Sequence, residues 1–250
     1  MGRRLGQHFL RDIAILDRIV DAIAPAADDT VLEIGPGDGT LTMRLLRRVA
    51  HVVAIERDPG LAAGLHGRDR LTVVAGDALE VPWPERTKVI GNVPYYITTP
   101  LIEKALTPPA RPVTVFLVQK EVADRVVALP GGKAYGALSV GVQAVALAER
   151  LFVIRAGAFH PPPKVDSAVL RLIPRAEPLV ADAERPPFRR FVTGLFGQRR
   201  KQLGRSLRAI ANLDRDEAAA LLRGLGILPQ ARPEVLPPEA LVRLFRAATR

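Results

Sequence analysis

The segment TVLEIGPGDGT, residues 30–40, gives the strongest indication of the fold. It joins a short run of strand character, Thr30–Ile34, to a turn that contains three glycines, and residues of helical composition follow. A strand that passes through glycines into a helix is typical of open α/β sheets, which bind ligands at the carboxyl ends of their strands. Because glycine has no β-carbon, a ligand can approach the backbone of this turn closely.

Other apolar runs of strand length follow, separated by segments of helical or turn composition. They are residues 51–55, 71–75, 88–90 and 113–118, with two later runs at 151–154 and 167–173. This alternation indicates a parallel, doubly wound sheet, and we interpret the last two runs as a hairpin at its edge, joined by the proline-rich residues 159–164. An irregular basic segment, residues 2–10, and an amphipathic helix behind the cap residue Asp12 precede the sheet.

The pattern becomes purely helical after residues 174–187, which are rich in proline, alanine and charge. Apolar stripes at helical spacing follow, and Asp214 with Glu217 resembles a capping box. We interpret the stripes as core. The sequence therefore predicts two domains, a ligand-binding α/β domain over residues 1–174 and a small all-helical domain over residues 175–250.

The composition limits the classes of protein. With 250 residues, 48% of them hydrophobic, the chain is long enough for one large core and a smaller companion domain. It contains no apolar run of membrane-spanning length and no signal peptide at its amino terminus, so we expect a soluble protein in the cytoplasm. Cysteine is absent and the four histidines are scattered, so we expect no metal site.

The formal net charge is +10, and arginine is far more frequent than lysine. A guanidinium group can bind phosphate through two hydrogen bonds, so nucleic acid is the leading class of partner. Arg199, Arg200 and Lys201, at the start of the helical domain, are the candidate RNA-binding residues. A solvated helix face is an equally good interpretation of these three residues.

The glycine turn departs from the dinucleotide-binding pattern. Its third glycine, Gly39, comes one residue early, and no Gly-x-x-x-x-Gly-Lys-Ser/Thr loop indicates phosphoryl transfer. Polar residues follow the next three strands, namely Glu56, Asp77 and Asn92. A carboxylate at Glu56 could accept hydrogen bonds from both hydroxyls of a ribose, and one at Asp77 from the amino group of an adenine. The sequence thus favours a site for an adenosine-bearing cofactor.

The tetrapeptide Asn92-Val93-Pro94-Tyr95 predicts the chemistry. The lone pair of an adenine N6 is delocalised into the ring, so an enzyme must localise it. The Asn92 side-chain oxygen and the Val93 carbonyl could each accept one N6 hydrogen and direct the amine at a sulfonium methyl group. Tyr95 would stack on the base, and because a sulfonium is already activated, positioning would suffice without a strong base.

Taken together, these motifs resemble the ribosomal small-subunit adenine dimethyltransferases, the KsgA family. The resemblance covers nearly the whole chain. It includes the segments at residues 6–10, 32–42, 91–95, 119–123, 133–140, 159–169 and 198–201. It implies a Rossmann-like class I fold with a seven-stranded, mostly parallel sheet and a small helical domain. It also implies that S-adenosylmethionine is used to make N6,N6-dimethyladenosine at two adjacent adenosines near the 3′ end of small-subunit rRNA.

The resemblance also assigns the site residues. The residues implied to contact the cofactor are His8, Leu10, Gly35, Gly37, Glu56, Asp77 and Asn92. Asn92 and Tyr95 would address the target base, and Phe159 would cover its other face. Members of the family usually carry asparagine at the position of His8. The implied partner is the rRNA of the small ribosomal subunit or its precursor, with the target adenosines in a loop or flipped out of the stack, and we expect a monomer.

Three other interpretations stay open at this point. A large-subunit rRNA adenine methyltransferase of the Erm type shares the glycine loop and Asn-x-Pro-Tyr, although residues 119–140 and 198–201 favour the small-subunit enzyme. A mainly non-catalytic assembly or transcription factor could use the same scaffold, but the intact Asn92 to Tyr95 motif disfavours it. A dinucleotide enzyme of another kind is the remotest of the three.

Overall fold

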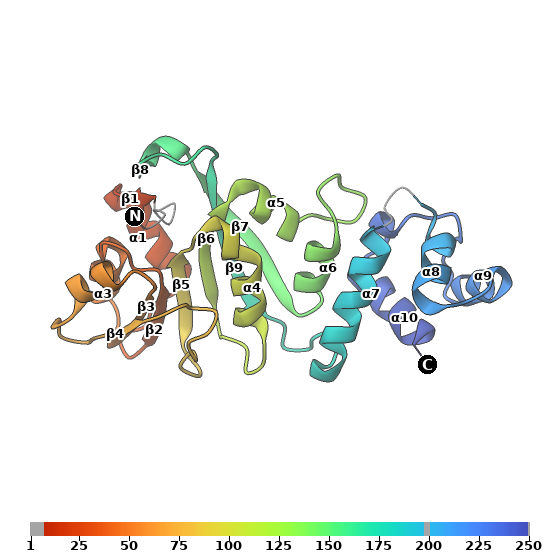
Figure 1. The fold of residues 1–250 in the computed structure, drawn as a ribbon, viewed down its shortest axis with the longest axis horizontal. Coiled ribbons are helices and arrows are strands. Elements are labelled where there is room, and N and C mark those ends of the chain that lie inside the picture. Colours follow the sequence, from red (N-terminus) through yellow and green to blue (C-terminus); the bar gives the residue numbers. More distant parts are fainter. Residues whose placement is uncertain (1–7, 198–200, 250) are drawn as a thin grey trace. The chain divides into compact units, whose positions relative to one another are not determined.

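Figure 1 shows the computed structural model of the protein, which describes residues 8–197 and 201–249. The chain divides into two compact units. They are a sheet unit, Met1–Ala123 with Ala148–Pro174, and a helical unit, Asp124–Leu147 with Arg175–Arg250. The expected domain division also falls between residues 174 and 175. The helical unit additionally includes residues 124–147 from the middle of the chain, and the roles of the two units stay predictions.

The main sheet has seven strands. Their bounds are β2 (Thr30–Ile34), β3 (His51–Glu56), β4 (Leu71–Ala75), β5 (Lys88–Asn92), β6 (Thr114–Gln119), β7 (Ala146–Ile154) and β9 (Ser167–Pro174). They lie in the order β4-β3-β2-β5-β6-β9-β7. Neighbouring strands from β4 to β6 are parallel, whereas β9 is antiparallel to β6. The predicted seven-stranded, mostly parallel sheet is confirmed.

Helices follow the parallel strands β2, β3, β5 and β6, as the alternating sequence predicts, whereas β4 leads to β5 without a helix between them (Figure 1). Those that begin in the sheet unit are α1 (Ile13–Ala22), α2 (Thr40–Leu45), α3 (Pro59–Leu65), α4 (Thr98–Leu106) and α5 (Lys120–Val126). Burial on both faces accounts for the continuous apolar runs of the central strands, since Thr114–Val118 of β6 are all buried. At the start of α1, the Asp12 side chain accepts a hydrogen bond from the Ile15 N–H at 3.0 Å, as the predicted cap requires.

A second sheet of two strands joins the amino-terminal segment to the proline-rich connection. Strand β1 (Phe9–Leu10) pairs antiparallel with β8 (Phe159–His160). The interpretation of residues 2–10 as irregular is therefore wrong for Phe9 and Leu10. Two-residue strands have no visible alternation, and the partner strand lies far along the chain, so the sequence pattern could not show the pairing.

The edge strand also differs from its prediction. Strand β7 begins at Ala146 rather than at residue 151 and includes the exposed residues Glu149 and Arg150. Charged side chains are tolerated at a sheet edge, and they masked the beginning of the strand in the hydrophobicity pattern. As predicted, β7 and β9 are neighbours and β7 lies at the edge of the sheet.

The helical unit contains the helices expected after the boundary together with one from the middle of the chain. They are α6 (Ala137–Gln143), α7 (Arg185–Gly197), α8 (Leu203–Ala211), α9 (Arg215–Gly224) and α10 (Pro238–Ala248). The predicted capping box is present at α9. Asp214 accepts hydrogen bonds from the N–H groups of Asp216 and Glu217 at 2.7 and 2.8 Å, and Glu217 accepts one from the Asp214 N–H at 2.8 Å.

The apolar stripes of the helical unit form its core. In α7 the buried residues are Phe188, Phe191, Val192, Leu195 and Phe196. Tyr135, which is completely buried, packs edge-on against Phe196 with ring centroids 5.9 Å apart. Its hydroxyl donates a hydrogen bond to the Leu236 carbonyl at 2.9 Å, which satisfies the polar end of a buried ring.

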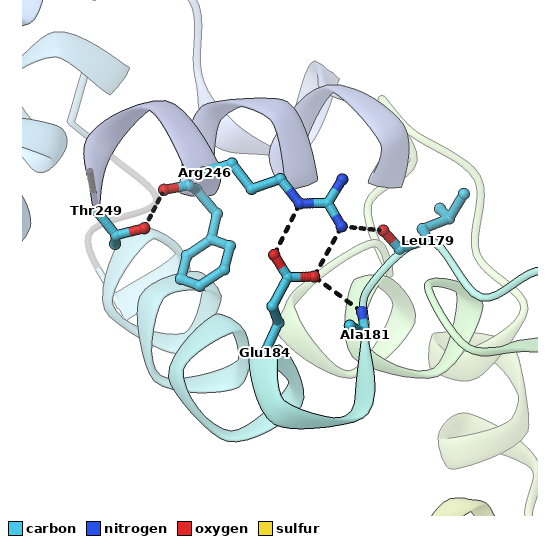
Figure 2. Close-up of polar contacts among 6 residues, drawn as sticks. Leu179, Ala181, Glu184, Arg246 and Thr249 are labelled. Atoms are coloured by element: carbon cyan, nitrogen blue, oxygen red, sulfur yellow. Dashed lines mark hydrogen bonds and ion pairs between the residues drawn. The ribbon is translucent and has the colours of Figure 1, made fainter.

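A doubly hydrogen-bonded ion pair joins α10 to Glu184, the residue directly before α7, as Figure 2 shows. The Arg246 guanidinium on α10 donates to both oxygens of Glu184, from Nε at 2.8 Å and from Nη2 at 2.7 Å, and also to the Leu179 carbonyl at 3.1 Å. Glu184 further accepts a hydrogen bond from the Ala181 N–H at 2.8 Å. The hydrogen bond from Arg246 lowers the pKa of Glu184 to about 2.

None of the helices in the described part of the chain is long and apolar enough to cross a membrane. Within residues 8–197 and 201–249, no group of three or more histidine, cysteine, aspartate or glutamate side chains is arranged to hold a metal ion.

Candidate active site

One cavity lies at the carboxyl ends of the parallel strands. Among the residues predicted to form the site, it is lined by His8, Leu10, Gly35, Gly37, Glu56, Asp77, Asn92 and Tyr95. These residues lie in or directly before β1 and at or just after the ends of β2, β3, β4 and β5. A parallel sheet brings such strand ends to one edge, which is where open α/β sheets bind their ligands. Phe159 is the one predicted catalytic residue that does not line the cavity.

The glycine turn needs its glycines for two reasons. Gly35, Gly37 and Gly39 all have positive φ angles, of 68°, 58° and 81°, which side chains disfavour. In addition, a β-carbon on Gly37 would lie 2.8 Å from the Phe9 ring, and one on Gly39 would lie 2.6 Å from Leu65. The turn therefore presents bare backbone to the cavity while β1 and α3 lie directly against it.

Glu56 fixes this turn and faces the same cavity. Its Oε2 accepts a hydrogen bond from the Gly37 N–H at 3.0 Å, and its Oε1 accepts one from the Asp58 N–H at 2.9 Å. The residue is only 5% exposed. Each carboxylate oxygen can accept a second hydrogen bond, so the geometry is compatible with the predicted binding of two ribose hydroxyls.

Asp77 follows β4 and has one oxygen held by the backbone. Its Oδ1 accepts a hydrogen bond from the Leu79 N–H at 2.9 Å, whereas its Oδ2 lies 3.5 Å from Nη1 of Arg57. Arg57 also lines the cavity, and its guanidinium donates a hydrogen bond to the Tyr96 hydroxyl at 3.2 Å. Arg57 and Tyr96 were not among the predicted site residues. The sequence indicated them only by position, because each directly follows a predicted site residue, Glu56 or Tyr95.

Asn92 is oriented by the backbone of His8, the residue directly before β1. Its Nδ2 donates a hydrogen bond to the His8 carbonyl at 2.8 Å, and because a carbonyl can only accept, the amide nitrogen must face that side. Asn92 lines the cavity, and its side-chain oxygen is the atom that can still accept a hydrogen bond. His8 is itself held by the β1–β8 sheet and by a hydrogen bond from its Nδ1 to the Pro161 carbonyl at 2.7 Å.

Tyr95 also lines the cavity, and its partners differ from those of Tyr96. Its ring is stacked on the His8 ring, with centroids 6.1 Å apart and planes at 26°, and its hydroxyl shares a hydrogen bond of 2.8 Å with Ser167 on β9. Burial raises the pKa of the Tyr95 hydroxyl. The phenol therefore stays protonated over the ordinary pH range. Stacking on His8 and the hydrogen bond to Ser167 together hold the ring in place. Ser167 was not predicted, because its position on β9 becomes relevant only through the antiparallel pairing with β6.

Glu33, directly before the glycine turn, is an unusual carboxyl group. It lines the cavity but is only 1% exposed, and its Oε2 has no hydrogen-bond partner among the described residues. Burial raises its pKa to about 8, and the nearby carboxylates of Glu56 and Asp38 add to the effect. The group therefore binds a proton near neutral pH, which removes the cost of an unpaired buried charge.

Phe159 and the three basic residues are the remaining predicted site residues. Phe159 on β8 is 4% exposed and belongs to the apolar cluster that includes Leu10, Leu16 and Ile154. Lys201 is exposed, just before α8, while Arg199 and Arg200 lie outside the described residues. The predicted roles of Phe159 at the target base and of the three basic residues at RNA stay predictions.

A parallel sheet with a glycine turn, followed by an acidic residue and an Asn-x-Pro-Tyr segment at successive strand ends, defines a class I methyltransferase of the S-adenosylmethionine-dependent type. The family model described as ribosomal RNA adenine dimethylase matches residues 2–249. The chain belongs to this family.

Individual relatives agree with the family assignment. The chain is 44% identical to "Ribosomal RNA small subunit methyltransferase A" of Acidithiobacillus ferrooxidans over 98% of this chain and 93% of that protein. It is likewise 44% identical to the protein of the same name in Gloeobacter violaceus, over 97% and 91% of the two chains.

Two solved structures resemble the whole chain. A dimethyladenosine transferase from Plasmodium falciparum superposes with a TM-score of 0.85 at 27% identity, covering 95% of this chain and 96% of that one. The 23S rRNA methyltransferase ErmE superposes with a TM-score of 0.74 at 31% identity, covering 97% and 100%. The fold class predicted from the sequence is confirmed by both, including the helical part after the sheet.

Proposed function

We propose that this protein transfers methyl groups from S-adenosylmethionine to N6 of two adjacent adenosines near the 3′ end of small-subunit rRNA, during assembly of that subunit. The observation that carries this proposal is the orientation of Asn92. Its amide nitrogen is bound to the His8 carbonyl, so its oxygen is available in the cavity wall as an acceptor for an amine. An acceptor at a fixed position beside a stacked tyrosine suits the edge of an adenine.

The chain's residues would act by positioning. The Asn92 oxygen and the Val93 carbonyl would each accept one hydrogen of N6, which localises the lone pair that attacks the methyl carbon. S-adenosylmethionine, when bound, supplies that methyl group on a sulfonium, which departs as a neutral thioether. The amine becomes cationic and then loses a proton to water, so no general base is required. Preorganised hydrogen bonds of this kind typically contribute a factor of about 10²–10³ in rate.

The cofactor would lie along the strand ends. Glu56 would accept hydrogen bonds from the ribose hydroxyls and Asp77 from the adenine amino group. The bare backbone of Gly35 and Gly37 would permit close approach, and the residues that would close the cavity at its amino-terminal side are His8 and Leu10. The unpaired Oε2 of the buried Glu33 supports the presence of a polar ligand group at this wall.

The target base would stack on Tyr95. A ring that is stacked on His8 and bonded through its hydroxyl to Ser167 is a rigid surface for a planar base. Phe159 would cover the other face of the base, although doing so requires this buried ring to turn toward the cavity. We therefore expect Phe159 to contact the base only in the complex with RNA.

The helical domain, residues 175–250 of the predicted division, would bind rRNA phosphates, with Arg199, Arg200 and Lys201 as the proposed contacts. The formal net charge of +10 supports a polyanionic partner. Such a substrate is found where ribosomes assemble, so the proposed location is the cytoplasm. The enzyme would act as a monomer on the small subunit or its precursor.

A large-subunit substrate is the second candidate, because the ErmE structure resembles the chain over its whole length at 31% identity. The relatives named for the small subunit match at 44%, which favours the small-subunit substrate. A non-catalytic role is disfavoured by the complete constellation of Asn92, Tyr95 and Glu56 in one cavity.

The experiment that tests the proposal is nucleoside mass spectrometry of ribosomal subunits that lack the modification, incubated with the protein and S-adenosylmethionine. Dimethyladenosine in the small subunit alone is the expected result, with Asn92→Ala as the inactive control. Dimethyladenosine in the large subunit would establish the second candidate instead. If neither subunit is modified while the cofactor still binds, the protein is not acting as this enzyme.

A further inference from the structure

Two residues outside the predicted site form a bridge at one end of the cavity. Arg57 comes directly after Glu56 at the end of β3, and Tyr96 belongs to the 3₁₀ turn Tyr95–Ile97 that follows β5. Both line the cavity. Nη1 of Arg57 donates a hydrogen bond to the Tyr96 hydroxyl at 3.2 Å and lies 3.5 Å from Oδ2 of Asp77. One guanidinium therefore links segments that follow three different strands.

The two adjacent tyrosines point to different partners. Tyr95 contacts Ser167 and His8, at the side proposed for the target base. Tyr96 instead accepts a hydrogen bond from Arg57, and the same guanidinium lies beside Asp77. Asp77 is the residue proposed to bind the adenine amino group of the cofactor. Tyr96 thus belongs to the cofactor's adenine end of the cavity rather than to the base end.

Stability does not account for this bridge. Tyr96 is 61% exposed and the Arg57 side chain 54% exposed. A hydrogen bond or ion pair between groups so open to water contributes only about 0–1 kcal/mol. The same contacts become stronger when a bound molecule covers them, because the guanidinium and the ring are then removed from water.

We propose that Arg57 and Tyr96 form a clasp over the adenine of the cofactor and determine how long the cofactor or its product stays bound. This inference rests on the function proposed above. Asp77 would meet the edge of the adenine, and the planar Arg57 guanidinium, which stacks readily on aromatic rings, would meet its face. Tyr96 is a positioning residue, because its hydroxyl holds the guanidinium in place through the bond at 3.2 Å.

The test is the dissociation rate of S-adenosylhomocysteine, measured on the full chain by stopped flow after calorimetric titration. The variants are Tyr96→Phe, which removes only the hydroxyl, Arg57→Leu, and the double variant. We expect Tyr96→Phe to accelerate dissociation about three- to tenfold, since a hydrogen bond to a charged group is lost, and Arg57→Leu to do so at least as strongly. The double variant should dissociate no faster than Arg57→Leu alone, because Tyr96 acts through Arg57.

Arg47→Leu is the matched control, since Arg47 is exposed and does not line the cavity. It should leave the dissociation rate unchanged, and none of the variants should shift the melting temperature of the ligand-free protein appreciably. Independent, multiplicative effects of Tyr96→Phe and Arg57→Leu, or no effect of either, would overturn the clasp. So would unchanged dissociation together with weaker binding of ribosomal subunits, because Tyr96 would then face the nucleic acid. If the unaltered protein fails to bind S-adenosylhomocysteine at all, the proposed function fails before the variants are compared.

Discussion

Two glutamates, one in each unit, have opposite environments. Glu33 of the sheet unit is buried with one oxygen unpaired, and burial raises its pKa to about 8. Glu184 of the helical unit accepts hydrogen bonds from two nitrogens of Arg246, Nε and Nη2, and from a backbone N–H, and these hydrogen bonds lower its pKa to about 2. The pair with Arg246 satisfies both oxygens of Glu184, whereas the strand ends of the sheet unit keep an unpaired carboxyl oxygen, Oε2 of Glu33, at the cavity wall. Unpaired polar groups reduce stability but are what a ligand can bind.

Substitutions of the two asparagines of the chain should separate activity from stability most strongly. Asn92→Ala should reduce methyl transfer to small subunits by about 10²–10³, because the proposed acceptor of N6 is lost. Asn212 ends α8 in the left-handed conformation, at a φ of 54°, so Asn212→Ala should reduce stability by about 1 kcal/mol through backbone strain. Turnover and thermal unfolding of both variants form the measurement. If the folded Asn212→Ala variant loses turnover, the helical unit contributes to activity as well as to stability, and the contrast between the two units fails.

Two glycine substitutions compare packing at the site with packing in a helix. A β-carbon on Gly91 would clash with the Ile34 carbonyl oxygen, so Gly91→Ala should destabilise the protein by about 1–3 kcal/mol. Gly141, in α6, has open space at the same position, and Gly141→Ala should stabilise by about 0.5–1 kcal/mol. Denaturant unfolding of both variants tests this contrast. Equal effects would show that the strand ends are less tightly packed than this clash indicates.

Glu33→Gln tests the cost of the unpaired carboxyl group. The folded state holds the proton up to about pH 8, whereas the unfolded chain releases it near pH 4.5, so the contribution of Glu33 to stability falls as pH rises through that window. Glutamine cannot ionise. We therefore expect the variant to gain roughly 3 kcal/mol relative to the original protein between pH 5.5 and pH 8.5. The measurement is the melting temperature across that range, and a constant difference between the two proteins would show that Glu33 does not titrate there.

Glu184→Gln should have the smallest effect and the opposite pH dependence. Because its pKa is lowered in the folded state, Glu184 stabilises the protein above pH 4.5, and this contribution is lost as pH falls toward 2. The pair with Arg246 is largely exposed, so we expect a loss of at most about 1 kcal/mol at pH 7. The difference should shrink below pH 4.5 and be smaller at pH 3 than at pH 7. Melting curves at pH 7 and pH 3 check it, and a larger loss in acid would mean that the variant disturbs packing rather than the ion pair.

The sequence predicted the site where the signal was local. Glu56, Asp77 and Asn92 each follow a strand that short apolar runs made recognisable, and parallel pairing then brings them to one edge. It could not predict that the His8 carbonyl orients Asn92 or that Arg57 holds Tyr96, because each contact joins residues far apart in the chain. Nor did composition reveal that residues 124–147 belong to the helical unit, since their apolar spacing is that of any helix.

By itself, the sequence determined the seven-stranded class of fold, the glycine turn and the family, because strand length, helical spacing and consecutive motifs are properties of neighbouring residues. Only the tertiary structure decided the direction of the Asn92 amide, the division of labour between Tyr95 and Tyr96, and the buried, protonated state of Glu33. Each of these depends on which distant groups lie within a few ångströms, and hydrogen bonding and desolvation act only at that range.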